Sequence, residues 1–327
     1  GDVFFLDVVV DAVEQRVDRI RLGYPEQASG SVAKGIVGLI ADIAETGPWF
    51  LLTLDNRVAV DDFSPCLVLL NNDLSAGRPA ILENLEQEVI PPLRAGWSTR
   101  KKSDHFTHYN QVAKEFAEQI DIDPWLVSPL TLQCGEVNFK EKSGIECLAK
   151  NVNNLLTSIR AKYAEYNIDR EPFVVVKADS GTYGMGIMTV KSAEEIENLN
   201  RKQRNKMSSA KEGLVVDNVL VQEGVYTFET LGEEKAVAEP VIYMMDHYVV
   251  GGFYRVHTGR GVNENLNAPG MHFEPLAFAQ SCSTPDQTDL PDSEPNRFYA
   301  YGVIARLALL AAAREIAWFN QALCSLR

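Results

Sequence analysis

The chain has 327 residues, which is enough for two or three domains with a sizeable core. Its formal net charge of −14 at pH 7 argues against a nucleic-acid partner, because binding phosphates requires a net basic face, and favours a small-molecule enzyme. Five scattered cysteines without a C-x-x-C pair favour a reducing cytoplasm over a disulfide framework or a zinc site, and the most apolar run, Leu307–Ala313, is far too short to span a membrane.

Apolar strand-like runs alternate with helical patterns along the chain, which predicts a fold of the α/β (α+β) class. In the first part, Cys66–Leu70 is typical of a buried strand, and it ends in Asn71, Asn72 and Asp73. Ligands tend to bind just past the carboxyl ends of strands in open α/β sheets, so these three side chains are candidate substrate ligands. A plain polar turn explains them equally well.

Paired prolines at positions 91 and 92 mark the predicted domain boundary, because they cannot continue a helix and favour an extended connector. We therefore divide the chain into residues 1–95, an expected N-terminal α/β domain, and residues 96–327. Within the second part, residues 281–296 are rich in Pro, Asp, Ser and Thr and predict a mobile surface loop. A strongly apolar helix is expected over residues 298–319.

Three consecutive cations, Arg100, Lys101 and Lys102, precede a predicted helix whose N-cap is expected at Ser103 or Asp104. Basic residues are unfavourable at a helix N-terminus, because they face the positive end of the helix dipole. An anion such as a phosphate would balance them. A solvated basic turn explains the segment equally well.

An apolar strand, a lysine and a glycine loop follow one another from Phe173 onward. Phe173–Val176 is β-branched and predicts a strand buried on both faces, with Lys177 where that strand ends. Gly181, Gly184 and Gly186 then form a loop whose backbone N–H groups can donate to phosphate oxygens. The lysine precedes the glycines, so the pattern is neither a P-loop nor a kinase loop. A tight hairpin beside a lysine is the alternative.

Two further core elements flank this unit. An apolar stripe predicts a helix over Ile145–Tyr166, and Val219–Gln222 predicts another buried strand. Gln222, Glu223 and Val225 lie at the end of that strand, where carboxylate and main-chain groups could hold a ribose and an adenine edge.

Paired charges stand in the next two predicted strands. Val237–Tyr243 carries Glu239 and Tyr248–Val256 carries Arg255. A buried charge is costly unless it is paired or binds a ligand, so the two residues need each other or a ligand. Downstream, a cluster of oxygen-bearing side chains suits Mg²⁺, although a capped loop explains it too; the cluster is Asn263, Glu264, Asn265 and Asn267.

The order of these motifs resembles that of ATP-grasp ligases: a lysine before a helix, Lys177 on a strand, a glycine loop, a Gln-Glu strand end, a strand with Arg255, and Asn-Leu-x-Ala-x-Gly at 265–270. Longer segments look like a small proteobacterial family of glutamate-cysteine ligases. They are residues 69–77, 95–106, 177–190, 199–207, 221–229 and 251–261. The resemblance runs from about Cys66 to the end of the chain and is poor over the first sixty residues.

The resemblance implies an ATP-grasp-like domain over 96–327 after a pre-ATP-grasp-like domain over 1–95. It also implies formation of γ-glutamylcysteine from glutamate, cysteine and ATP, the first step of glutathione synthesis, with ATP and Mg²⁺ as cofactors. The γ-carboxylate would attack the γ-phosphate of ATP, and the cysteine amine would capture the acyl phosphate. One alternative is another ATP-dependent carboxylate-amine ligase of glutathione-synthetase type, and the other is a non-catalytic nucleotide-binding protein. A homo-oligomer is left open.

The resemblance also assigns roles to residues. Lys177 and Arg255 are the expected catalytic residues. The expected ATP ligands are Lys101, Lys102, Lys177, Ser180, Gly181, Tyr183, Gly184, Gly186, Gln222, Glu223 and Val225. The expected amino-acid ligands are Asn71, Asn72, Asp73, Arg100 and Asn265. ATP-grasp chains usually carry an acidic residue and an asparagine on a late strand as metal ligands, and here Glu239, Glu264 and Asn265 are assigned in their place.

Overall fold

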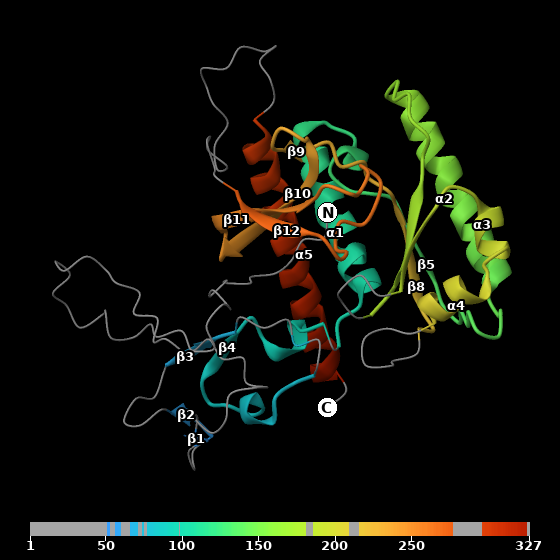
Figure 1. Ribbon diagram of the computed structural model, residues 1–327. Helices are drawn as coiled ribbons and strands as arrows, with labels where there is room; N and C mark the ends of the chain where they lie inside the picture. Colours follow the sequence, from blue (N-terminus) through green and yellow to red (C-terminus); the bar gives the residue numbers. More distant parts are fainter. Residues whose placement is uncertain are drawn as a thin grey trace. The chain divides into compact units, whose positions relative to one another are not determined.

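The structure is a computed structural model (Figure 1) and describes residues 51–52, 56–59, 66–70, 74, 77–97, 99–180, 186–208, 216–276 and 296–325. The described residues fall into two compact units, one ending at Arg100 and one beginning at Lys101. The assignment of residues 1–95 and 96–327 to a pre-ATP-grasp-like and an ATP-grasp-like domain stays a prediction. The expected mobile loop, 281–296, lies outside the described residues except for its last residue.

The first unit contains two small sheets. In one, β1 (Leu51–Leu52) runs antiparallel to β2 (Val58–Ala59), and in the other β3 (Leu67–Leu69) runs parallel to β4 (Glu88–Ile90). Two 3₁₀ turns, Ala80–Leu82 and Leu93–Ala95, flank β4. The core of this unit is formed by Val58, Val68, Leu70, Leu74 and Leu82. The strand expected over Cys66–Leu70 is confirmed as β3.

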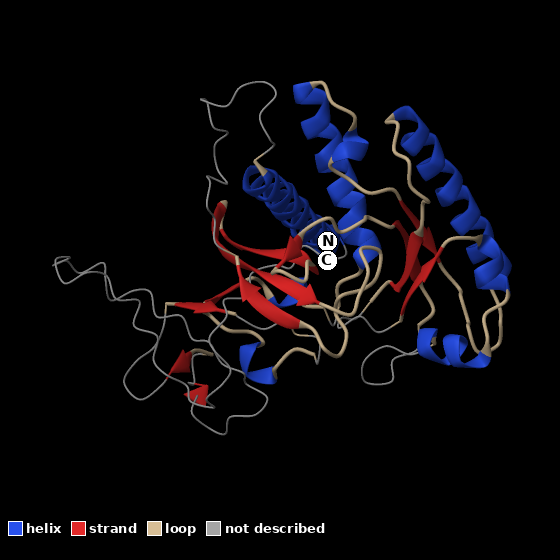
Figure 2. Cartoon of the chain, turned by 45° about the horizontal axis from the view of Figure 1, so that its top comes forward, coloured by secondary structure: helices blue, strands red, loops and turns tan. Residues whose placement is uncertain are grey.

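The second unit contains two four-stranded antiparallel sheets. The first, the α2-covered sheet, has the strand order β5 (Thr131–Cys134), β8 (Val219–Glu223), β6 (Val174–Ala178), β7 (Ile187–Val190). Helix α2 (Ile145–Glu165) covers one face of it, and the short helices α3 (Ala193–Glu197) and α4 (Arg201–Met207) follow β7. In Figures 1 and 2, α1 and the second sheet lie on the other side.

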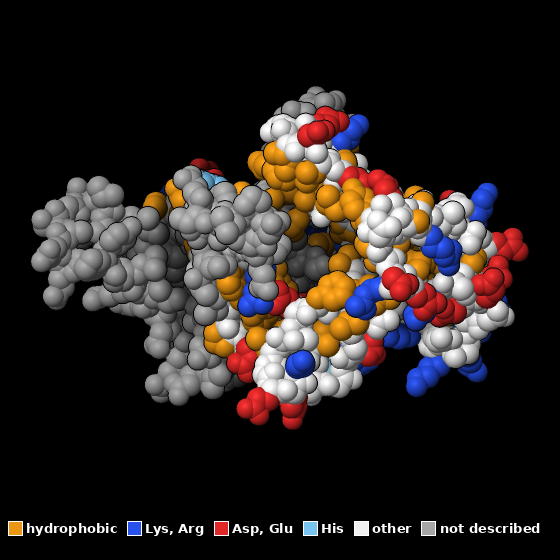
Figure 3. All heavy atoms as spheres, turned by 90° about the horizontal axis from the view of Figure 1, so that it is seen from above, with side chains coloured by type: hydrophobic (Ala, Val, Ile, Leu, Met, Phe, Trp, Pro, Cys, Tyr) orange, Lys and Arg blue, Asp and Glu red, His pale blue; other side chains and the backbone are white. Residues whose placement is uncertain are grey.

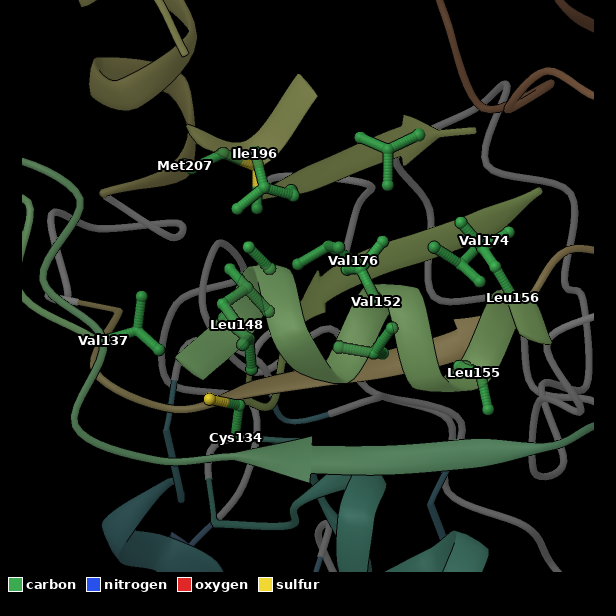
Figure 4. Packing of buried hydrophobic residues seen from close by; sticks show 14 of the residues in the cluster. Cys134, Val137, Leu148, Val152, Leu155, Leu156, Val174, Val176, Ile196 and Met207 are labelled. Carbon is green, nitrogen blue, oxygen red and sulfur yellow. The ribbon is translucent and has the colours of Figure 1, made fainter. Parts of the chain in front are cut away.

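Helix α2 forms because its apolar residues recur at helical spacing, and the same stripe packs on the sheet. The predicted stripe is buried in full: Leu148, Val152, Leu155, Leu156, Ile159 and Tyr163. It contacts the valines that β6 and β8 turn towards the helix (Figure 4), which are Val174, Val176, Val219 and Val221. Together these residues form the largest core cluster of the described residues.

Strand β6 is covered on one face only. Val174, Val176 and Ala178 are buried under α2, whereas Val175 and Lys177 are half-buried on the opposite face. The prediction of a strand buried on both faces is therefore wrong. The neighbouring strand β8 is buried at all five residues, so the second face of this antiparallel sheet is covered more completely at β8 than at β6.

The second, or α5-covered, sheet has the order β12 (His272–Pro275), β11 (Tyr248–His257), β10 (Ala236–Met245), β9 (Thr230–Leu231). The start of α5 (Arg297–Ser325) packs on it through Phe298. The middle of α5 packs against α1 (Lys102–Ile120), and a 3₁₀ turn, Pro124–Leu126, follows α1. Helix α5 contains the apolar helix expected over 298–319.

Two features of the helices bear on partners. None of the described helices combines the length and the apolar character that crossing a membrane requires. On the face shown in Figure 3, acidic and basic side chains are interspersed over the region of α2, so neither sign of charge gathers there.

Candidate functional site

Lys177 and Gln222 share the face of the α2-covered sheet that is turned away from α2, here called the open face. Val175 pairs with Gln222 and Lys177 pairs with Leu220 in the β6–β8 ladder. Because alternate residues of a strand face the same side, Lys177 and Gln222 lie on the open face of adjacent strands. Lys177 was expected at the end of its strand, but β6 continues to Ala178. Lys177 therefore lies within strand β6, one residue before the end of the strand.

Gln222 has an unsatisfied acceptor. Its side chain is only 6% exposed, and among the described residues its Oε1 atom accepts no hydrogen bond. An unsatisfied buried acceptor costs about 1–3 kcal/mol, so such atoms are generally paired with a donor. A ligand that carries an amino group, as adenine does, would supply the missing donor.

The side chain of Glu223 lies on the face of the sheet opposite to that of Gln222. Its Oε2 atom accepts hydrogen bonds from Trp125 Nε1 and from the Leu130 backbone N–H, both at 2.9 Å. Trp125 packs against the core under α2, so this carboxylate points away from the open face. The side chain predicted to hold part of the nucleotide thus fixes the strand to its neighbours.

Burial raises the pKa of Glu223, since loss of water around the carboxylate outweighs the hydrogen bonds from Leu130 and Trp125. A carboxyl whose pKa is higher in the folded chain binds protons more readily when folded. Its contribution to stability therefore decreases as pH rises from the unfolded pKa, about 4.3, through the raised folded value.

We expect the melting temperature of Glu223→Gln, relative to that of wild type, to increase as pH rises through this window, because the variant lacks the ionisation. Thermal unfolding at a series of pH values measures the difference. Glu197→Gln, at an exposed position, is the control for replacing a glutamate by glutamine. A pH-independent difference for Glu223→Gln would mean that the buried carboxyl does not titrate as described.

The end of β6 is tied to the start of α1. Asp179 is 1% exposed and follows the last residue of the strand. Its Oδ1 accepts from the Ser103 backbone N–H at 2.8 Å, and its Oδ2 accepts from Ser103 Oγ at 2.8 Å. The Lys102 N–H donates to the Asp179 carbonyl at 2.9 Å, and Lys102 Nζ donates to the Ala178 carbonyl at 3.0 Å.

These contacts correct two expectations. The helix begins at Lys102, with Lys101 as its N-cap, rather than being capped by Ser103 or Asp104. An anion was expected at this basic helix start, and the protein itself supplies one in the carboxylate of Asp179, which favours the positive end of the helix dipole. The sequence signal was an acidic residue directly between a strand and a glycine loop.

Asp179→Ala is expected to lower the free energy of unfolding by about 2–3 kcal/mol, because it removes two buried hydrogen bonds and a charge at a helix N-terminus. Ser103→Ala, which removes one of these bonds, should cost about 1 kcal/mol. Denaturant unfolding measures both. Asp217→Ala, at an exposed position, is the control. Equal stability of the Asp179 and Asp217 variants would contradict the capping role.

The glycine loop follows Asp179 and ends at Gly186. Ser180 is exposed, whereas Gly181, Tyr183 and Gly184 lie outside the described residues. Gly186 has φ +61°, and a Cβ there would lie 3.0 Å from the Ala178 Cβ, so this position requires glycine. The Gly186 carbonyl accepts from the Ala178 N–H at 2.8 Å, which closes the base of the loop.

Glu239 and Arg255 face each other across β10 and β11. They are register partners, and Arg255 Nη1 lies 3.6 Å from Glu239 Oε2. Their neighbours Ala238 and Val256 pack towards α5, so the pair lies on the sheet face away from that helix. The sequence predicted that these two charges need each other or a ligand, and the ion pair between them confirms the first of these alternatives.

The residues assigned to Mg²⁺ bind protein donors. Glu264 accepts from the Gly261 N–H at 2.7 Å and from Arg260 at 2.9 Å, which together lower the pKa of its carboxyl. Asn265 Oδ1 accepts from the Asn267 N–H at 2.9 Å. No group of three or more His, Cys, Asp or Glu in the described part of the chain could hold a metal ion. The role of Glu239, Glu264 and Asn265 as metal ligands stays a prediction.

Of the remaining assigned residues, three are described by the structure, and their roles stay predictions. Val225 is exposed just beyond β8, and Lys101 is exposed before α1. Arg100, in the first unit, is buried and lies over the Trp97 ring at 5.0 Å. Asn71, Asn72 and Asp73 lie outside the described residues.

Comparison with known proteins gives the family. The crystal structure of a candidate γ-glutamylcysteine synthetase from Methylobacillus flagellatus KT is 64% identical, with a TM-score of 0.73, over 83% of this chain. This chain spans 63% of the length of that protein. The structure of D-cycloserine synthetase DcsG is 13% identical over 70% of this chain and 57% of that one, and its TM-score of 0.30 does not establish a common fold. No curated protein matches. The glutamate-cysteine ligase family model matches residues 49–316, so the chain belongs to this family.

Proposed function

We propose that this protein joins the γ-carboxyl group of glutamate to the amine of cysteine at the expense of ATP, through an acyl phosphate. Membership of the glutamate-cysteine ligase family supports the reaction. The observation that carries the site is the open face, where Lys177 and the unsatisfied Gln222 lie on adjacent strands beside the base of the glycine loop.

The open face offers groups that suit a nucleotide at two positions, Gln222 and Lys177. Gln222 Oε1 would accept a hydrogen bond from the amino group of adenine, which would satisfy the buried amide oxygen. Lys177, one strand away and nearer the loop, would place its ammonium group on the phosphates. This order along the sheet, base at Gln222 and phosphates at the loop, is what an ATP-grasp-like site would require, and we propose that architecture for the second unit.

The reaction needs charge neutralisation more than covalent help from the protein. A γ-carboxylate oxygen attacks the γ-phosphorus, and ADP leaves as the bond to its β-phosphate oxygen breaks. The cysteine amine then attacks the acyl carbon, inorganic phosphate leaves, and the amine loses a proton. Lys177 would stabilise charge on the phosphates during the first step. We assign Arg255, which Glu239 holds in place, to the transferring phosphoryl group or the carboxylate.

Water exclusion would be the task of the glycine loop, since the acyl phosphate is easily hydrolysed. Its base is fixed by the Gly186–Ala178 hydrogen bond and by Asp179. We propose that the segment between these anchors covers the phosphates and that its backbone N–H groups, including those of Gly181 and Gly184, donate to them.

Magnesium is proposed as a cofactor because the charge of a triphosphate opposes the approach of a carboxylate. Glu239, Glu264 and Asn265 all bind protein donors, so they do not present a ready set of oxygen ligands, and we route no step through them. Turnover should nevertheless stop in excess chelator and return when Mg²⁺ is added back. Full turnover in chelator, measured as ADP release, would remove the metal from the proposal.

The test of the function is ADP release over a panel of amino-acid pairs. Rapid release with glutamate and cysteine together, and little with either alone, is the expected result. Equal rates with other amine acceptors would favour a different carboxylate-amine ligase, and ATP binding without turnover for any pair would favour a non-catalytic protein. We place the enzyme in the cytoplasm, because its five scattered cysteines do not suggest a disulfide framework.

A further inference from the structure

Two cysteines that are 13 residues apart along the chain lie in contact. The sulfur atoms of Cys134 and Cys147 are 3.7 Å apart, and the Cys134 thiol donates to Cys147 Sγ. Cys134 is the last residue of β5, and Cys147 is the third residue of α2. Figure 4 shows the Cys134 side chain rising from the strand towards α2, beside Leu148.

The contact is held by two rigid elements. Cys134 is 3% exposed and belongs to the core cluster, as do Leu148 and Val152 of α2. A disulfide has an S–S distance of about 2.05 Å, so the sulfurs need to approach by less than about 2 Å. Rotation of the two side chains can supply much of that distance.

The two thiols differ in their access to solvent. Cys147 is exposed, so a dissolved oxidant can reach it. Burial raises the pKa of Cys134 to about 11, and the hydrogen bond to Cys147 acts in the same direction. The buried thiol is therefore protonated at neutral pH. Cys147 is the position at which oxidation can begin, and Cys134 is the neighbour that can complete it.

We propose that Cys134 and Cys147 form a redox-sensitive dithiol, which hydroperoxides convert into an intramolecular disulfide. In the first step the Cys147 thiolate attacks a peroxide oxygen, the O–O bond breaks, and Cys147 becomes a sulfenic acid while hydroxide or alkoxide leaves. In the second step Cys134 loses its proton and attacks the Cys147 sulfur, the S–O bond breaks, and water leaves. The pair is oxidised by two electrons and the peroxide is reduced by two. A dithiol reductant reverses the change.

This inference does not depend on the ligase activity, because neither cysteine lies on the open face. Leu132 and Cys134 both belong with the core under α2, on the side opposite Gln222. The site therefore has its own readout, the covalent state of the two sulfurs, whatever the protein catalyses.

The experiment treats the full chain with hydrogen peroxide, alkylates the remaining thiols, and maps disulfides by mass spectrometry of a non-reduced digest. A peptide that links Cys134 to Cys147, lost after treatment with dithiothreitol, is the expected product. Cys134→Ser should leave Cys147 as a sulfenic acid that dimedone traps, and Cys147→Ser should leave Cys134 reduced at the same peroxide dose. Cys66→Ser, at an exposed position outside the pair, should form the link as wild type does.

Two results would overturn the proposal. One is wild-type protein in which peroxide takes Cys147 to a sulfinic acid without any link to Cys134. The other is equal dimedone labelling of Cys147 in wild type and in Cys134→Ser, since a resolving thiol must remove the sulfenic acid. Both measurements require folded protein, and the thermal unfolding curve of each variant verifies this. The disulfide mapping of the wild-type protein tests the proposal even if a variant fails to fold.

Discussion

Lys177→Ala is expected to lower kcat/KM for ATP by about 100-fold or more while leaving the unfolding transition close to that of wild type. Loss of one pre-positioned donor to a developing negative charge commonly costs about 10²–10³ in rate. The fold should tolerate the change, because Lys177 is half-buried on the open face and the opposite face of β6 carries the core residues Val176 and Ala178. Steady-state kinetics with ATP as the varied substrate, together with thermal unfolding, measure the two effects.

Lys191→Ala is the matched control, since it removes a lysine just beyond the neighbouring strand β7. Lys191 pairs with Glu171 at 2.6 Å, and both side chains are largely exposed, so neither activity nor stability should change noticeably. Equal loss of activity in both variants would show that the enzyme responds to net charge rather than to a lysine on the open face. An early unfolding transition for Lys177→Ala, with ATP affinity preserved, would make this lysine structural.

Hydrophobic spacing was enough to predict the elements that are covered on one side. The stripe of α2 is buried as expected, and β10 and β11 pair with Glu239 opposite Arg255. In each case the apolar period follows directly from which face meets the core. The parts that escaped prediction lack such a period. Strand β12, for example, is exposed at all four residues and is held mainly by its ladder with β11.

Long-range partners explain the errors. The valine run of β6 looked like a strand buried on both faces, because local composition does not reveal what packs on each face of the strand. Likewise, the start of α1 is set by Asp179, which is 76 residues away from Ser103 in sequence. A helix cap supplied from another element leaves no local pattern, so sequence reasoning placed the N-cap two or three residues too late.

The candidate site divides in the same way. Lys177 and the glycine loop were predicted from the order of residues along one hairpin, which is local information. Gln222 and Glu223 were predicted together at one strand end, but the opposite directions of their side chains follow from strand alternation and from Trp125, 98 residues before Glu223. That difference decides which of the two can meet a ligand on the open face, and only the tertiary structure supplies it.

Gly224→Ala is expected to destabilise the second unit strongly, because this glycine packs directly on a buried aromatic ring. A Cβ at position 224 would lie 2.0 Å from Cε2 and 2.1 Å from Cδ2 of Phe173. Phe173 is 2% exposed and makes an edge contact with Tyr226 at 5.0 Å, so the ring has little room to move. Its backbone cannot yield easily either, since the Phe173 carbonyl accepts from the Gly224 N–H at 2.8 Å.

Overpacking of this kind costs about 3 kcal/mol, which for a unit of this size lowers the melting temperature by about 6–12 °C. Gly251→Ala is the control, because Gly251 lies within β11 and a Cβ there meets nothing within 4 Å. Combining Gly224→Ala with Phe173→Leu should recover part of the loss, since the smaller side chain makes room for the methyl group. Equal melting temperatures for the two alanine variants would mean that β8 can shift away from Phe173. The close contact between Gly224 and the Phe173 ring would then not fix the position of Gln222 and Glu223.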